Sequence, residues 1–228
     1  MSAKRCSEIL DITDKGIWMA IKKSSISQPV VLVGGGGHAR ACIDVIERQG
    51  SYSVAGIVDP TKPVNSHLSA YPYFGSDLVL NKLITEYPHA LVTVGQVGNA
   101  STRKRIFDDL VKLGYCLATI VSPWAYVSPE ASLSEGTIVL HGAIINSSSK
   151  IGKNCIINTR SLVEHDVEVG DHTHISTGAI LNGGVSVGHG TFVGSGATIR
   201  DKISIGNECF VGMGCVVKAS LADGERLV

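Results

Sequence analysis

The chain has 228 residues, 20 Lys and Arg against 20 Asp and Glu, 26 glycines and an aromatic content of 5%. The length suits one or two domains, and the balanced charge leaves no basic surplus to attract nucleic acid or an anionic membrane. Many glycines and few aromatic residues disfavour a sandwich or barrel built on bulky side chains, and they favour a fold with many tight, similar turns.

Residues 1–27 have a mixed pattern and form an N-terminal extension to which we assign no function, with a short helix expected between Glu8 and Ile21. Residues 28–118 predict a small α/β domain with a Rossmann-like parallel sheet, because apolar runs typical of buried strands alternate with helical stretches. The expected strands are 29–33, 54–58 and 90–94, and the expected helices are 38–49, 78–86 and 101–113.

Four consecutive glycines, Gly34 to Gly37, follow the first expected strand and precede a helix. Backbone N–H groups at such a junction can bind phosphate, and the helix N-terminus favours negative charge. Asp59 comes 22 residues after Gly37, as an acid does in dinucleotide-binding folds, although the full Gly-x-Gly-x-x-Gly spacing is lacking. The loop is therefore either a nucleotide-phosphate site or only a tight strand-to-helix turn.

From Val121 onward an aliphatic residue recurs every six residues without interruption. The seventeen positions from Val121 to Val217 are all Val, Ile or Leu. Six residues make one short strand and one turn, and three such units close a triangular coil of eighteen residues with the aliphatic side chains stacked inside. Residues 119–228 therefore predict a left-handed parallel β-helix that follows the α/β domain.

The cysteines fit a reducing compartment. The six show no Cys-x-x-Cys pair, the chain opens without a secretory pattern, and no apolar run approaches ~18 residues. We therefore expect a cytoplasmic protein without a membrane span. Cys155, Cys209 and Cys215 occupy repeat positions that take small residues, and we interpret them as packing groups rather than metal ligands or disulfides.

The stretch 158–166 carries polar residues that the repeat does not require. His165 stands two places after an inward aliphatic residue, Asp166 follows it, and Gly183 lies one coil further on. The imidazole and the glycine backbone should therefore lie one above the other, which gives a general base beside an N–H that could hold an oxyanion. A neighbouring carboxylate would fix the imidazole tautomer. The alternative is that His165 is a solvated corner residue.

Residues 28–217 resemble the bacterial hexapeptide-repeat sugar acyltransferases, typified by the bacillosamine and perosamine N-acetyltransferases and the sialic acid O-acetyltransferases. The resemblance rests on Gly-Gly-Gly-Gly-His-Ala at 34–39, Val-Asp at 58–59, Asn-Thr-Arg-Ser-Leu-Val-Glu-His-Asp at 158–166 and Leu-Asn-Gly at 181–183. It implies acetyl-CoA as co-substrate and a homotrimer, which would also cover the flat faces of the prism, with the acetyl-transfer site in the groove between two subunits.

The resemblance also implies direct attack on the thioester, without an acyl-enzyme. His165 would be the general base, and Asp166 its acidic partner, at a position where family members often have Glu and some have Gly. The Gly183 N–H would hold the thioester oxygen, and His174 matches a second family histidine near the reacting groups, which we assign to the coenzyme site. Family members usually continue into a Gly-x-Pro-Ala-Lys-like segment where this sequence ends at Val228, so either a shortened chain or weaker coenzyme binding is expected.

For the α/β domain the resemblance implies a nucleotide-linked sugar as substrate. The residues that would cradle its phosphates are Gly35, Gly36, Gly37 and His38. Asp59 would contact its base or sugar. The leading expectation is N-acetylation of an amino sugar in bacterial surface glycan biosynthesis, because an amine is the easier nucleophile. The rival is O-acetylation of a sialic acid, since 101–104 and 158–165 look at least as close to that group.

Two alternatives belong to other classes. The same β-helix hosts zinc-dependent carbonic anhydrases, but no two histidines lie eighteen residues apart here, so a three-histidine zinc site is not favoured. A purely structural β-helix would need neither the α/β domain nor the His-Asp pair. Three further histidines, His141, His172 and His189, are expected at the surface because no partner is evident.

Overall fold

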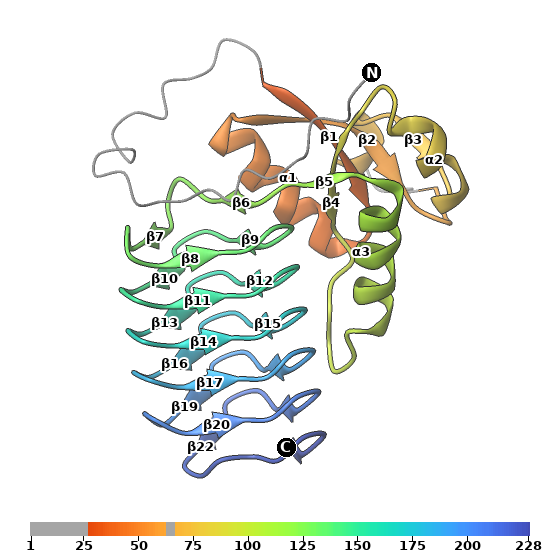
Figure 1. The fold of residues 1–228 in the computed structure, drawn as a ribbon. Coiled ribbons are helices and arrows are strands. Elements are labelled where there is room, and N and C mark those ends of the chain that lie inside the picture. The colour runs from red at the N-terminus through yellow and green to blue at the C-terminus, as the bar shows by residue number, and fades with distance from the viewer. Residues whose placement is uncertain (1–26, 63–66) are drawn as a thin grey trace.

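The structure, a computed structural model, describes residues 27–62 and 67–228. Figure 1 shows an α/β domain at one end of a triangular β-helix, with the C-terminus at the far end. The helix expected between Glu8 and Ile21 lies outside the described residues. No helix of the described part is both long enough and apolar enough to cross a membrane.

The α/β domain holds a five-stranded parallel sheet in the order β3-β2-β1-β4-β5, which confirms the predicted sheet type. Its strands are β1 (Gln28–Val33), β2 (Tyr52–Val58), β3 (Tyr73–Gly75), β4 (His89–Val92) and β5 (Cys116–Leu117). Its helices are α1 (Gly37–Gln49), α2 (Leu80–Leu83) and α3 (Ser101–Leu113), with 3-10 turns η2 (Leu68–Ala70) and η3 (Asp77–Val79). The strand order reverses between β1 and β4, and the crevice at the carboxyl ends of two such strands is where ligands of open α/β sheets bind.

Two details of the domain differ from the prediction. The helix expected at 78–86 is a four-residue α2 preceded by η3, and Pro88 follows soon after, a residue that disfavours helical backbone in the position before it. The strands β3 and β5 were not predicted, because two or three residues are too few to show a period of two.

The β-helix has three faces, each a parallel sheet of two-residue strands. The domain face carries β6 (Ile120–Val121), β9 (Ile138–Val139), β12 (Ile156–Ile157), β15 (His174–Ile175), β18 (Phe192–Val193), β21 (Phe210–Val211) and β23 (Arg226–Leu227). The apolar face carries β7 (Tyr126–Val127), β10 (Ile144–Ile145), β13 (Leu162–Val163), β16 (Ile180–Leu181), β19 (Thr198–Ile199) and β22 (Val216–Val217). The third face carries β8 (Ser132–Leu133), β11 (Lys150–Ile151), β14 (Glu168–Val169), β17 (Ser186–Val187) and β20 (Ser204–Ile205).

The predicted aliphatic column forms the core of the prism. Each strand from β6 to β22 ends in one of the seventeen aliphatic residues, which pack on one another inside together with Ala131, Ala143, Cys155 and Cys209. Successive coils pair at a spacing of eighteen residues, as in Val163↔Leu181. The last pairing, Val211↔Leu227, spans only sixteen, so the final coil is two residues shorter.

The α/β domain packs against the domain face. Ile138 and Ile156 point outward from the prism, yet both are fully buried because they join a cluster that includes Cys42 and Ile43 of α1. The connection from β4 to α3 runs down beside the prism, and α3 returns along it (Figure 1). Gly98 of this connection lies against the ring of Phe210, since an added Cβ would come within 3.4 Å of it.

Candidate functional site

His165 and Asp166 lie at the corner between the apolar face and the third face, directly after β13. Nδ1 of His165 and Oδ2 of Asp166 are 2.8 Å apart, and both side chains are exposed. This contact orients the ring and leaves Nε2 without a partner in the described part of the chain. An imidazole held by a carboxylate at one nitrogen is able to accept a proton at the other.

Gly183 lies directly beneath the ring of His165 on the next coil. A Cβ added to Gly183 would come within 2.7 Å of both Cε1 and Nε2 of His165, and the N–H of Gly184 donates to the His165 carbonyl at 2.9 Å. Within the described residues the N–H of Gly183 donates to nothing. An open backbone donor therefore stands beside an oriented imidazole, as an oxyanion site requires.

A groove of about 700 Å³ runs from His165 toward the C-terminal coils. Its walls include three cations that the sequence analysis did not single out, Arg200, Lys202 and Lys218. The coil period of eighteen residues could have identified these cations from the sequence. Arg200 and Lys218 stand eighteen residues apart and share the repeat position of Glu164, and Lys202 shares the repeat position of Asp166. Two carboxylates, Glu164 and Asp201, also line the groove, so its cations outnumber its acids three to two and leave it a modest preference for an anionic ligand.

His174 lies elsewhere, on the domain face in β15. Its Nδ1 donates to the Gln96 carbonyl at 2.6 Å, and its Nε2 accepts from the Asn158 side-chain amide at 3.0 Å. Burial lowers the pKa of His174 from the ordinary 6.5 to about 4, so the ring is neutral at pH 7. Within one chain the structure does not bring His174 to the corner that His165 occupies.

The glycine loop and Asp59 meet at the carboxyl end of the sheet. The N–H of Gly35 donates to Oδ2 of Asp59 at 2.7 Å, and the N–H of Thr61 donates to Oδ1 at 2.8 Å. The carboxylate therefore organises the loop. Gly36 and Gly37 are exposed at the start of α1, which has no side-chain cap and no acid in its first turn. These N–H groups can receive an anion.

His38 sits at the inner side of this loop. Its Nε2 is enclosed and has no hydrogen-bond partner among the described residues. The pKa of His38 falls from the ordinary 6.5 to about 3, first through burial and then through the charges of Arg103 and His174. His38 is therefore neutral at pH 7 and brings no charge to the loop.

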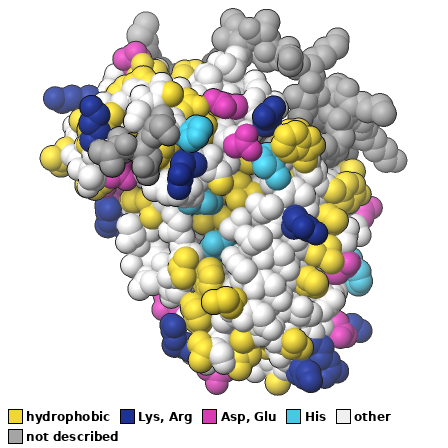
Figure 2. Space-filling view, turned by 180° about the vertical axis from the view of Figure 1, so that it is seen from behind, with side chains coloured by type: hydrophobic (Ala, Val, Ile, Leu, Met, Phe, Trp, Pro, Cys, Tyr) yellow, Lys and Arg dark blue, Asp and Glu magenta, His cyan; other side chains and the backbone are white. Residues whose placement is uncertain are grey.

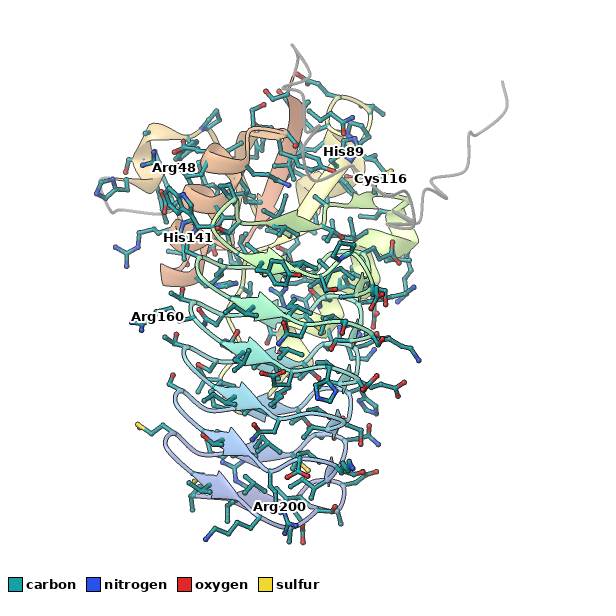
Figure 3. The ribbon with its side chains drawn as sticks, turned by 90° about the vertical axis from the view of Figure 1, so that its left-hand side faces the viewer. Arg48, His89, Cys116, His141, Arg160 and Arg200 are labelled. Carbon is teal, nitrogen blue, oxygen red and sulfur yellow. The ribbon has the colours of Figure 1, made fainter. Side chains whose placement is uncertain are left out.

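The expectation that His141 and His172 are plain surface residues is wrong. Nδ1 of His141 is 2.6 Å from Ser122 Oγ, and its Nε2 is 2.8 Å from Asp44 Oδ2, so it joins α1 to the first coils. Figure 3 shows His141 close to Arg48, which pairs with the same Asp44. Ser122 is fully buried, so this Ser-His-Asp chain has no exposed nucleophile and connects the two domains instead.

His172 packs edge-on against the ring of Phe107, and its Nδ1 is 3.0 Å from the Asn154 side-chain amide. Asn154 stands one coil of eighteen residues before His172, whereas the contact with Phe107 of α3 is one that no coil period reports. Cys155 and Cys209 are buried in the prism, as expected for packing groups, and Cys215 is partly exposed. No three metal-ligating side chains gather anywhere in the described ranges.

Family comparisons match both halves of the chain. Residues 29–110 match the PglD N-terminal domain. Residues 148–183 match the bacterial transferase hexapeptide model of six repeats, and residues 184–219 match the hexapeptide repeat of succinyl-transferase. A search of curated proteins gave no match.

Solved structures with the same two-domain fold include a perosamine N-acetyltransferase variant from Caulobacter crescentus in complex with CoA and GDP-perosamine. It is 36% identical, with a TM-score of 0.81, over 87% of this chain and 92% of that one. The acetyltransferase domain of PglB from Neisseria gonorrhoeae, in complex with acetyl coenzyme A, is 28% identical with a TM-score of 0.81, over 88% and 96%. WeeI from Acinetobacter baumannii, 23% identical with a TM-score of 0.79 over 89% and 97%, shares the fold.

Proposed function

The chain belongs to the hexapeptide-repeat sugar acyltransferase family, and from that membership we propose that it transfers the acetyl group of acetyl-CoA to the amino group of a nucleotide-linked sugar. The acyltransferase activity follows from both hexapeptide matches and from the two CoA-bound relatives. The observation that carries the finer proposal is the His165–Asp166 pair above the open N–H of Gly183.

In the proposed reaction the amine nitrogen attacks the thioester carbonyl carbon directly. Nε2 of His165 accepts the amine proton as the new C–N bond forms, and Asp166 stabilises the imidazolium. The carbonyl oxygen becomes an oxyanion that accepts a hydrogen bond from the Gly183 N–H. The C–S bond then breaks, and the CoA sulfur leaves with the proton that His165 held.

The groove below His165 suits the coenzyme. CoA carries several phosphate charges, and Arg200, Lys202 and Lys218 line this groove in the coils beyond the His-Asp pair. A thioester placed at Gly183 could therefore extend its pantetheine and nucleotide toward these cations. His174 lies away from this groove in its own chain. It can contact the coenzyme, as the resemblance implies, only if the groove of a neighbouring subunit lies against the domain face.

The α/β domain is the proposed site for the sugar nucleotide. The exposed N–H groups of Gly36 and Gly37 at the start of α1 suit a diphosphate. The N-acetyltransferase at 36% identity has GDP-perosamine bound, which favours an amine acceptor over the hydroxyl of a sialic acid. The product would then supply a bacterial surface glycan.

The first experiment is thiol release from acetyl-CoA with a panel of acceptors. The panel holds UDP-, dTDP- and GDP-linked 4-amino-6-deoxy sugars together with free and CMP-linked sialic acid. We expect turnover with one nucleotide amino sugar. Turnover with a sialic acid alone would replace the proposal by O-acetylation.

The His165→Ala variant tests the proposed base. We expect kcat to fall by roughly 10²–10⁴-fold, because the amine proton loses its acceptor, while thermal melting stays unchanged since the side chain is exposed. His189→Ala, at another exposed corner, is the matched control and should keep wild-type turnover. Comparable activity in the two variants would remove His165 from the mechanism.

A further inference from the structure

Arg103 of α3 is a fully buried cation without an acidic partner. Its side chain is 1% exposed, and burial lowers its pKa only to about 10, so it is charged at neutral pH. Nη1 donates to the carbonyls of Val92 and Val94 at 2.7 and 2.9 Å, and Nε donates to the Asn154 carbonyl at 3.1 Å. Nη2 has no partner, and no carboxylate pairs with this guanidinium among the described residues.

A buried guanidinium without an acidic partner lowers the stability of the fold. A buried charge that is met only by backbone dipoles costs stability unless something compensates it. A neutral side chain of similar volume would pack the same space without that cost. Packing alone therefore does not explain why a charged residue occupies this position.

The backbone that Arg103 holds is the segment at the carboxyl end of β4 that packs against the glycine loop, here called the Val94–Gly95 wall. Gly34 approaches this wall so closely that an added Cβ would lie 2.6 Å from the Val94 nitrogen, and one added to Gly95 would lie 3.4 Å from His38 Cβ. Thr93 Oγ1 also donates to the Gly34 carbonyl at 2.6 Å. The guanidinium thus stands directly behind the glycine loop.

Two cations lie near the glycine loop: Arg40, whose Nη2 would be 3.6 Å from a Cβ added to Gly37 at the surface, and the buried Arg103. His38 belongs to the loop, but burial and the neighbouring guanidinium keep its ring unprotonated at pH 7. A ligand at the exposed start of α1 therefore meets Arg40 at the surface and, from behind the loop, the field of Arg103, which the buried surroundings screen less than water would.

We propose that Arg103 is a positioning residue that gives the glycine loop its affinity for a diphosphate, by fixing the Val94–Gly95 wall and by placing an uncompensated positive charge behind the loop. The inference rests on the proposed binding of a nucleotide-linked sugar in this domain. A bound diphosphate would supply the negative charge that no carboxylate of the described residues supplies to Arg103. Loss of this charge should therefore weaken the binding of a nucleoside diphosphate and not that of a nucleoside.

The test is calorimetric titration of the full chain with UDP, dTDP and GDP and with the corresponding nucleosides. We expect Arg103→Met to weaken binding of the preferred diphosphate roughly tenfold or more, with the nucleoside affinity unchanged. Arg103→Lys, which keeps the charge, should retain most of the affinity. Arg105→Met, which removes an exposed cation two residues along α3, is the control and should bind like wild type.

A second variant decides the matter if Arg103→Met does not fold. Asn154→Asp leaves Arg103 in place and adds a carboxylate to the residue whose backbone carbonyl accepts from Arg103 Nε, and it should lower the diphosphate affinity by a similar factor. In turnover assays, both variants should raise KM for the nucleotide sugar while kcat and the KM for acetyl-CoA stay near wild type. Unchanged diphosphate affinity in either folded variant overturns the inference. A wild-type chain that binds no nucleoside diphosphate overturns the proposed nucleotide site instead.

Discussion

Asp166 occupies a backbone position where a side chain is costly. Its φ is +59°, one of a series of fourteen left-handed residues that recurs every six residues along the corners of the prism from Gly136 to Gly214, seven of them glycine and seven not. A non-glycine residue there costs of order 1 kcal/mol or more. At this corner the side chain has a use, because its carboxylate holds His165 Nδ1 at 2.8 Å.

Gly183 gives a prediction at the same scale. Gly183→Ala puts a Cβ within 2.7 Å of the His165 ring, and the ring can swing into solvent, so the fold should be little affected. The displaced base should lower kcat by roughly 10²-fold. Steady-state kinetics beside a thermal melt measure both effects. A large drop in melting temperature with intact kcat would mean that Gly183 serves the coil and not the reaction.

At the scale of the element, the corner glycines hold successive coils together by close approach. Gly194 and Gly212 occupy the same corner one coil apart. A Cβ on Gly194 would meet the Gly212 and Met213 backbone at 2.6 Å, whereas one on Gly212 would meet the Leu227 carbonyl at 3.2 Å.

We therefore expect Gly194→Ala to lower the free energy of unfolding by roughly 1–3 kcal/mol, since backbone must shift to admit the methyl group. Gly212→Ala, the matched control, should cost clearly less. Urea unfolding monitored by circular dichroism compares the two. Equal losses would show that coil spacing relaxes freely at both levels.

At the scale of the whole molecule, the junction between the domains buries polar groups beside its apolar cluster. His38 and His174 both lie there with pKa values of about 3 and about 4, lowered chiefly by burial. Above pH 6.5 both rings are neutral in the folded and the unfolded chain and contribute no pH dependence. Below it the unfolded chain takes up protons that the folded chain refuses, so acid favours unfolding.

The free energy of unfolding should consequently fall between about pH 6.5 and pH 4, by up to roughly 1.4 kcal/mol per pH unit for each histidine. Denaturant titrations at several pH values measure the slope. His174→Gln should reduce it, and His189→Gln, at an exposed corner, should leave it as in wild type. A profile that is flat down to pH 4.5 would contradict the buried neutral state.

The exposed side chains of the apolar face lead to a prediction about the oligomeric state. Tyr126, Ile144 and Val216 lie on it with 55%, 41% and 61% of their surface exposed, and Figure 2 shows hydrophobic side chains at several levels of the prism on the side turned away in Figure 1. Apolar surface of this kind marks an interface, and we propose that it joins three chains.

Light scattering should give a mass three times that of the 24.0 kDa chain. Ile144→Glu should lower this mass, because it buries a charge in the proposed contact. Leu78→Glu, at an exposed apolar residue of the α/β domain, is the control and should not. A wild-type monomer would argue against a site shared between subunits.

The sequence by itself determined the prism and the corner that holds His165 and Asp166, because stacking in a coil of eighteen residues follows from local spacing. The inward aliphatic column and the placement of His165 over Gly183 needed only that count. The α/β sheet type followed from alternating strands and helices, although β3 and β5 were too short to detect.

Only the tertiary structure decided the junction. The contacts of Asp59 with Gly35, of His141 with Asp44 and of Arg103 with Asn154 join residues 24, 97 and 51 positions apart. No repeat relates such residues, so no sequence period could report their contacts. Burial, which sets the charge state of His38, His174 and Arg103, likewise arises only when the α/β domain is packed against the prism.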